Sequence, residues 1–275
     1  MKILVTGSNG FIGKNLIARL LDNGHTVSNF EWVPNVVPDC SEFDKVVHLG
    51  AISSTTETDV EKVMQQNLDF SQRLLQVCDM QGIDLIYASS ASVYGPTSHF
   101  TEDGPLFPQS PYAWSKYLFD RSVQMVPVEE YQCRVQGLRF FNVYGEGEEH
   151  KGFQKSVFHK FKEQALTTGV IEPFEGSDTI ARDFVYVGDV CEIIEKFFNI
   201  DQSGIWNLGT GKAESFGNIA RHIATQHNAV VKEIPVPDSV KNQYQSFTQS
   251  NNTKLLDTIG DYNFTTVFEW IDNNG

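Results

Sequence analysis

The hydrophobic pattern along the chain alternates between short apolar runs and longer stretches with apolar residues at helical spacing. Strands are expected at 3–6, 26–30, 45–49, 83–88 and 134–140, where the runs are short and rich in β-branched residues. Helices are expected at 11–21, 57–80 and 112–125, where apolar residues recur on one helical face. This alternation predicts an α/β fold, with a Rossmann-type doubly wound parallel sheet and helices on both of its faces.

The second half of the chain is less regular. Helices are expected at 152–168 and 215–227, and strands at 183–187, 205–208 and 230–234. We therefore expect a first domain of residues 1–150 together with about 183–205. Residues 151–275 are expected to form a smaller C-terminal lobe that is interleaved with it.

Composition and charge narrow the class of protein. The chain has no apolar stretch long enough to span a membrane, and its N-terminus, MKILVTG, lacks the pattern of a signal peptide. A net charge of −14 opposes binding to nucleic acid or to an anionic membrane. The four cysteines are far apart, which predicts buried thiols in a cytoplasmic protein with no metal site. His48 is expected in the core and His150 in a loop.

A glycine motif follows the first predicted strand directly. In TGSNGFIG, Gly7, Gly10 and Gly13 have the spacing that permits a tight turn and close approach of the backbone to a pyrophosphate. The helix that begins with Phe11 and Ile12 offers free N–H groups to the same phosphates, and Asn9 lies inside the turn. The motif predicts that the first domain binds a dinucleotide. The smaller C-terminal lobe is then expected to bind the substrate.

Glu31 lies 18 residues after Gly13, at the end of the second predicted strand. A carboxylate at this position accepts hydrogen bonds from ribose hydroxyls and repels a 2′-phosphate. No Arg or Lys follows before Lys45. The pattern favours NAD over NADP, with a solvated surface glutamate as the alternative.

Tyr112 and Lys116 are four residues apart at the start of a predicted helix, and therefore share one helical face. An adjacent ammonium is expected to lower the pKa of the phenol, so that it can take a proton from a hydroxyl while hydride leaves the carbon. Ser90, in the sequence YASSASVYG after a strand, supplies a hydroxyl for the same oxygen. Taken alone, a Tyr/Lys pair at this spacing is common on surfaces, but here it follows the glycine motif and the serine-rich strand end.

Five motifs in order carry a resemblance to a known family: TGSNGFIG, SSASVYG, YAWSK, RFFNVYG and RDFVYVGD. The chain resembles the extended short-chain dehydrogenases/reductases that act on nucleotide sugars. Within them, GAISSTTETD, HKGFQKSV, FEGSDTIARDFVYVGDV, GIWNLGTGKAESF and YQSFTQ resemble the ADP-glyceromanno-heptose 6-epimerase family, cytoplasmic enzymes of heptose supply for bacterial surface polysaccharide. The resemblance implies an isomerase with tightly bound NAD(P), which oxidises C6 to a ketone and returns hydride to the opposite face.

The resemblance also implies roles for further residues. Lys151 would be the second acid/base group, and Asn67 would help to hold the cofactor. The substrate would contact Ser53, Ser54, Asn142, Ser156, Phe174, Arg182 and Tyr244. Each role has a plainer alternative. Lys151 could be a solvated loop residue and Asn67 a surface residue. The serines and Asn142 could lie in plain turns, Arg182 could form a surface ion pair, and the two aromatic residues could belong to the core. The family forms homo-oligomers, so we expect one here.

The chain departs from the family pattern in the short connection between the second and third predicted strands. Only 13 residues separate Glu31 from the strand at 45, where relatives have a further strand and helix with an acidic residue that binds adenine. Asp39 is the candidate replacement. The C-terminal helix is also short. A 4-epimerase or 4,6-dehydratase is an alternative function, although Ala91-Ser92 replaces the Asp-Glu pair that dehydratases use. A third possible function is that of a non-catalytic NAD-binding regulator, which the retained Tyr/Lys pair disfavours.

Overall fold

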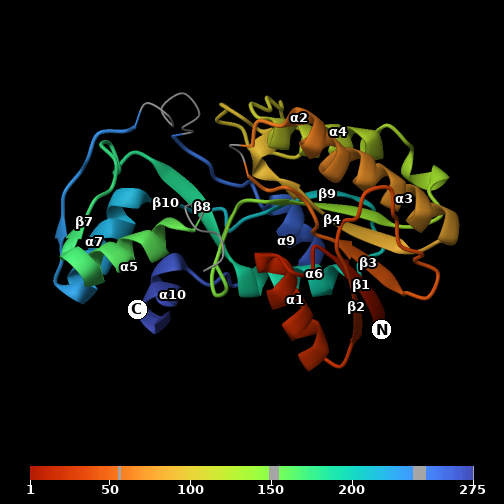
Figure 1. Ribbon diagram of the computed structural model, residues 1–275, viewed down its shortest axis with the longest axis horizontal. Helices are drawn as coiled ribbons and strands as arrows, with labels where there is room; N and C mark the ends of the chain where they lie inside the picture. The colour runs from red at the N-terminus through yellow and green to blue at the C-terminus, as the bar shows by residue number, and fades with distance from the viewer. Residues whose placement is uncertain (55–56, 149–154, 238–245, 275) are drawn as a thin grey trace.

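The computed structural model describes residues 1–54, 57–148, 155–237 and 246–274, which form a larger and a smaller lobe (Figure 1). The larger lobe is built on a six-stranded sheet with the order β2-β1-β3-β4-β5-β9. Its strands are β1 (Lys2–Thr6), β2 (Thr26–Phe30), β3 (Lys45–His48), β4 (Asp84–Ser90), β5 (Val135–Phe140) and β9 (Gly204–Leu208). Every pairing is parallel, which confirms the predicted α/β fold.

Helices cover both faces of this sheet (Figure 1). One layer contains α1 (Phe11–Asp22), α6 (Val187–Phe197) and α9 (Thr253–Ile259), and the other contains α2 (Val60–Val63), η1 (Met64–Asp69), α3 (Phe70–Gln81) and α4 (Pro111–Gln124). Successive residues of β1 point into opposite layers, so that Val5 packs with Leu16 and Ile193, while Leu4 packs with Leu74. Burial on both faces explains the continuous apolar runs of the inner strands.

The long helix expected at 57–80 is divided in three. It begins at Val60, because the Asp59 side chain accepts a hydrogen bond from the Lys62 amide at 3.0 Å and caps it. Residues Met64–Asp69 then form a π-helical turn, and the helix ends at Gly82, whose φ of +67° closes it. Short turns η2 (Ala91–Val93) and η3 (Val128–Glu130) precede and follow α4.

The smaller lobe has its own sheets and core. A three-stranded sheet, β10-β8-β6, contains β6 (Asn142–Tyr144), β8 (Ala181–Tyr186) and β10 (Ala213–Ser215), and a two-stranded sheet pairs β7 (Val170–Ile171) with β11 (Val230–Val231). Helices α5 (Val157–Thr168), α7 (Phe216–His227) and α10 (Val267–Asn274) pack on them. Between Phe140 and Ser215 the chain crosses from the larger to the smaller lobe, back, and across again. Within the described residues, no helix has the length and apolar character needed to cross a bilayer.

Candidate functional site

The glycine turn between β1 and α1 lies where the strand order reverses, because β1 has β2 on one side and β3 on the other. Gly7 has a φ of +69°, and a Cβ there would lie 2.5 Å from the Cα of Gly50 at the end of β3. A Cβ on Gly13 would lie 2.2 Å from the Gly7 carbonyl oxygen. Helix α1 begins after Gly10 with no side chain capping its N-terminus. The turn therefore has the close backbone packing and the uncapped helix end that a pyrophosphate requires.

Glu31 lies beside this turn. One oxygen of its carboxylate, Oε1, accepts hydrogen bonds from the Ser8 hydroxyl at 2.6 Å and from the Asn9 amide at 2.8 Å. The side chain is exposed and directly follows β2. The structure thus brings Asn9 and Glu31 together at the carboxyl end of the sheet, and these residues fit a dinucleotide whose ribose lies next to its phosphates.

Ser90, Tyr112 and Lys116 come together at the carboxyl end of β4. Ser90 is the last residue of β4, and its side chain interacts with Tyr112 near the start of α4. One turn further along α4, the buried Lys116 Nζ donates to the Ala88 carbonyl oxygen at 2.8 Å. Burial lowers the pKa of Lys116 to about 8, although the nearby charge of Asp120 opposes the shift.

The pKa of Tyr112 is raised above its usual value, so the expectation that Lys116 would lower it is wrong for the protein alone. Burial of the phenol is the largest cause, because it disfavours the phenolate. The hydrogen bond from Ser90 lowers the pKa, and the negative charge of Asp120 raises it. Among the described residues, no cation is a cause of a lower Tyr112 pKa.

A buried ion pair lies behind the Ser90, Tyr112 and Lys116 group, and the sequence motifs did not predict it. The Arg139 Nε of β5 donates to Asp120 Oδ2 at 2.9 Å, and both side chains are 0% exposed. The same carboxylate accepts from the Ser89 hydroxyl at 2.9 Å and the Tyr87 hydroxyl at 3.1 Å. Two signals were present in the sequence: Asp120 continues the four-residue spacing of the Tyr/Lys pair, and Arg139 interrupts an apolar strand.

Asn67 is buried in the π-helical turn rather than on the surface. Its Oδ1 accepts from the Ile52 amide at 2.8 Å, and its Nδ2 donates to the Ile52 carbonyl at 3.0 Å. The same Nδ2 donates to the Ser115 hydroxyl at 3.0 Å. The side chain therefore joins the loop after β3 to the helix that carries Tyr112 and Lys116.

His48 extends this network to the glycine turn. Its Nδ1 accepts from the Thr6 hydroxyl at 2.6 Å, and its Nε2 lies 2.7 Å from the Ser71 hydroxyl. The Ser71 proton is donated to the Asn67 carbonyl, so Nε2 must be the donor to Ser71. Burial, followed by the charge of Lys116, lowers the pKa of His48 to about 3 and keeps the ring neutral. The predicted core position of His48 is confirmed.

The candidate substrate residues are distributed around the carboxyl ends of the strands. Ser53 and Ser54 follow β3 and the clamped Ile52. Asn142 begins β6 directly after β5 and pairs with Phe184 of β8.

Arg182 precedes Phe184 by two residues and is 9% exposed, with its guanidinium carbon 5.6 Å from the centre of the Phe216 ring. Asn142 and Arg182 therefore lie at one end of the smaller sheet. Phe174, by contrast, pairs with Ile234 beside the β7–β11 sheet.

Lys151, His150 and Tyr244 lie outside the described residues. Ser156 lies inside them, as the residue before α5, and its amide donates to Glu148 Oε2 at 2.8 Å. Glu148 is buried and also accepts from the Gly145 amide at 3.1 Å. One carboxylate thus fixes the backbone on both sides of the segment 149–154.

Asp39 does not replace the missing adenine ligand. Its Oδ1 accepts from the Ser41 amide at 3.0 Å and from the Gln81 side chain at 2.8 Å. Gln81 is the last residue of α3, shortly before β4 begins. Asp39 therefore lies at the amino ends of the strands, whereas the glycine turn lies at their carboxyl ends.

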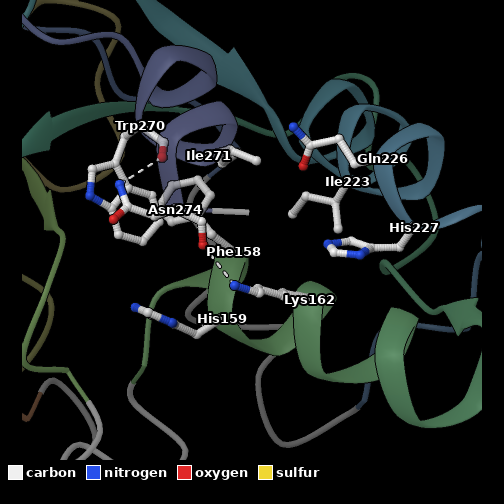
Figure 2. A pocket seen from close by; sticks show the side chains of 9 residues that line it. All are labelled: Phe158, His159, Lys162, Ile223, Gln226, His227, Trp270, Ile271 and Asn274. Atoms are coloured by element: carbon white, nitrogen blue, oxygen red, sulfur yellow. Dashed lines mark hydrogen bonds between the residues drawn. The ribbon is translucent and has the colours of Figure 1, made fainter.

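A small pocket lies in the smaller lobe, between α5, α7 and α10 (Figure 2). Its volume is about 40 Å³, far below the several hundred Å³ of a typical small-molecule site. It is lined by Phe158, His159, Lys162, Ile223, Gln226, His227, Trp270, Ile271 and Asn274. Since none of the predicted site residues is among them, this pocket is not the candidate site. Among the described residues, no group of three or more His, Cys, Asp or Glu is placed to hold a metal ion.

Comparison with known proteins agrees with this geometry. Among similar solved structures, the ADP-L-glycero-D-manno-heptose-6-epimerase of Helicobacter pylori is 26% identical, with a TM-score of 0.84 over 99% of this chain and 94% of that one. An NAD-dependent NDP-hexosamine 5,6-dehydratase of tunicamycin biosynthesis is 25% identical, with a TM-score of 0.83 over 98% and 95%. The Thermus thermophilus UDP-glucose 4-epimerase, in complex with NAD, is 25% identical, with a TM-score of 0.77 over 99% and 98%.

The family match covers the glycine turn, the Ser/Tyr/Lys group and the strands that position them. A model of the NAD dependent epimerase/dehydratase family matches residues 3–38 and 29–209. These ranges include β1 through β9, and therefore every strand of the larger sheet. The chain belongs to the NAD dependent epimerase/dehydratase family.

Proposed function

We propose that the protein is a nucleotide-sugar epimerase that inverts C6 of an ADP-heptose. The observation that carries the proposal is the placement of Ser90, Tyr112 and Lys116 together at the carboxyl end of β4, after a glycine turn shaped for a dinucleotide. Identity of 26% to the heptose epimerase of Helicobacter pylori over nearly the full length of both chains supports the choice of sugar. The Ala91-Ser92 sequence after Ser90 lacks the carboxylates that an elimination would use.

The residues of this chain divide the work of the reaction. A nicotinamide dinucleotide, when bound, would supply a reversible acceptor for hydride. Tyr112 accepts the proton of the sugar hydroxyl as the carbon loses hydride, and the products are a ketone and a neutral phenol. Ser90 holds the same oxygen, and Lys116 keeps positive charge at this end of α4. Return of hydride to the other face of the ketone, with a proton to its oxygen, completes the inversion.

Lys151 is the proposed proton donor for that other face. We expect Lys151→Ala to retain oxidation and re-reduction on one face but to lose net inversion. Exchange of the C6 hydrogen with deuterium-labelled cofactor would measure the first activity, and the epimer ratio would measure the second. Inversion at the wild-type rate in Lys151→Ala would remove this residue from the mechanism.

The test of the function is a direct assay of epimerisation. ADP-D-glycero-D-manno-heptose is incubated with the enzyme, and the C6 epimer is quantified by chromatography and NMR, with UDP-glucose as the competing substrate. Tyr112→Phe should lower turnover by at least about a hundredfold, because it removes the proton acceptor. Tyr117→Phe, on the same helix, is the matched control. Sustained accumulation of free NADH would show a net dehydrogenase, and conversion of UDP-glucose alone would show a 4-epimerase.

We further propose that the enzyme is a homo-oligomer. Helix α4 and the residue that caps its C-terminus expose large apolar side chains: Trp114 is 44%, Leu118 37% and Met125 76% exposed. Large apolar side chains grouped on one helix are typical of a protein interface. Light scattering after size exclusion should show an oligomer, and Leu118→Glu should shift it toward the monomer; a wild-type monomer at micromolar concentration would contradict this.

A further inference from the structure

The loop between β2 and β3 forms one wall of a pocket of about 630 Å³. The opposite wall is the outer face of η1 and α3. This volume is within the usual range for a small-molecule site. The first residue of the loop wall, Trp32, directly follows Glu31, whose carboxylate is bound to the Asn9 amide of the glycine turn. The pocket therefore begins one residue along the chain from the carboxylate that is bound to the glycine turn.

The loop wall is apolar because of one tight turn. The Val36 amide donates to the Val33 carbonyl at 3.1 Å, and Asn35 adopts a φ of +62° after Pro34, as a turn of this kind requires. The turn leaves Val33 and Val36 47% and 45% exposed beside the partly buried Trp32. The chain thus presents an indole and two valines where it has no strand or helix between β2 and β3.

The helix wall is polar, with an aromatic residue beneath it. Gln65, Asp69, Gln72 and Gln76 line the pocket, and their spacing places them on one helical face. Phe70 lies among them and stacks on Phe30 of β2, with ring centres 5.8 Å apart and planes 2° apart.

Arg73 joins the two walls, since its Nη2 donates to the Asn35 carbonyl at 3.2 Å. The tight turn is therefore held against the helix by a hydrogen bond at its tip. The Phe30–Phe70 stack holds it at its base.

We propose that this pocket binds the adenine of the dinucleotide, and that the Trp32–Val36 turn replaces the segment that is missing between β2 and β3. The inference rests on the proposed function and adds to it the residues that bind the base. With the pyrophosphate at the glycine turn and the ribose at Glu31, the base is the next group along the ligand. Adenine has flat apolar faces and a nitrogen-rich edge, which match an indole and valines opposite a row of side-chain amides.

The experiment measures binding of ADP-ribose, which contains the adenosine and diphosphate of the cofactor but cannot react. Calorimetric titrations compare wild type, Trp32→Ala, Trp32→Phe and Val36→Glu, each freed of endogenous cofactor. Val230→Glu is the matched control, because Val230 is an exposed valine of the smaller lobe, at 64%. Melting temperatures establish that each variant is folded.

We expect Trp32→Ala and Val36→Glu to bind ADP-ribose about tenfold more weakly, as loss of one aromatic–base stack requires. Trp32→Phe should recover most of the affinity, and Val230→Glu should be unchanged. ADP-ribose should quench tryptophan emission in wild type and not in Trp32→Phe. Tight wild-type binding that both Trp32→Ala and Val36→Glu retain would overturn the pocket assignment alone. Absence of ADP-ribose binding by wild type would overturn the proposed function itself.

Discussion

Replacement of Asp120 by asparagine tests how the buried ion pair supports the site. Both side chains of the pair are 0% exposed, and Asp120 accepts three hydrogen bonds, from Tyr87, Ser89 and Arg139. The substitution keeps the size of the side chain but leaves the Arg139 guanidinium buried without its counter-charge. Removal of one member of a buried pair costs about 3–5 kcal/mol.

That cost corresponds to a large fall in thermal stability. At about 2–4 °C per kcal/mol for a chain of this order of size, Asp120→Asn should melt about 6–20 °C below wild type. Urea unfolding followed by circular dichroism measures the free energy directly. The double variant Asp120→Asn/Arg139→Met removes the unpaired charge as well, and should be more stable than Asp120→Asn alone.

The same substitution has a second, independent readout. The charge of Asp120 raises the pKa of Lys116, so Asp120→Asn should lower that pKa further below about 8. The loss of activity on the alkaline side should then occur at lower pH than in wild type. A loss of less than about 1 kcal/mol in Asp120→Asn would show that the two buried charges do not depend on each other. Additive effects of the Asp120 and Arg139 substitutions would show the same.

Three further predictions concern the same network. Activity should fall as pH rises through about 8, because the buried Lys116 ammonium loses its proton there, and a flat profile to pH 9.5 would contradict the role of its charge. Gly13→Ala should purify without dinucleotide, as measured by the absorbance ratio at 260 and 280 nm, because its Cβ would lie 2.2 Å from a backbone oxygen of the turn. Ser71→Ala should lower the free energy of unfolding by about 1–3 kcal/mol, because the His48 N–H loses its acceptor. Thr225→Ala removes a comparable helix hydrogen bond on the surface and should cost less than about 0.5 kcal/mol.

The sequence was sufficient to predict the parallel sheet and to select residues that the structure brings together at its carboxyl end. Short apolar runs identify parallel strands because both faces of such strands are buried, and β1, β3 and β5 follow that pattern. The glycine turn, Glu31 and the Tyr112/Lys116 pair depend on local spacing, and local spacing is what a sequence shows directly.

The remaining features depend on contacts between distant segments. The π-helical turn at Met64–Asp69 adds one residue to a turn without changing which residues are apolar, so periodicity does not detect it. Arg73 reaches Asn35 across 38 residues of sequence. From the sequence, the cation of Lys116 is expected to lower the pKa of Tyr112. In the structure, burial raises this pKa and is the largest cause of its shift, and burial is a property of the whole fold.

The repeated crossing of the chain between its two lobes limits how substrate preference can be re-engineered. A cassette containing the smaller lobe would have to be cut after β5, before α6, after β9, before α9 and beyond α9, and each junction would have to close without strain. The carboxylate of Asp183 makes such an exchange harder, because it accepts hydrogen bonds from the amides of Thr210, Gly211 and Ser250 and so joins β8 to two other stretches of chain. New specificities in this scaffold are therefore expected to arise through single residue changes at the junction of the lobes rather than through exchange of modules.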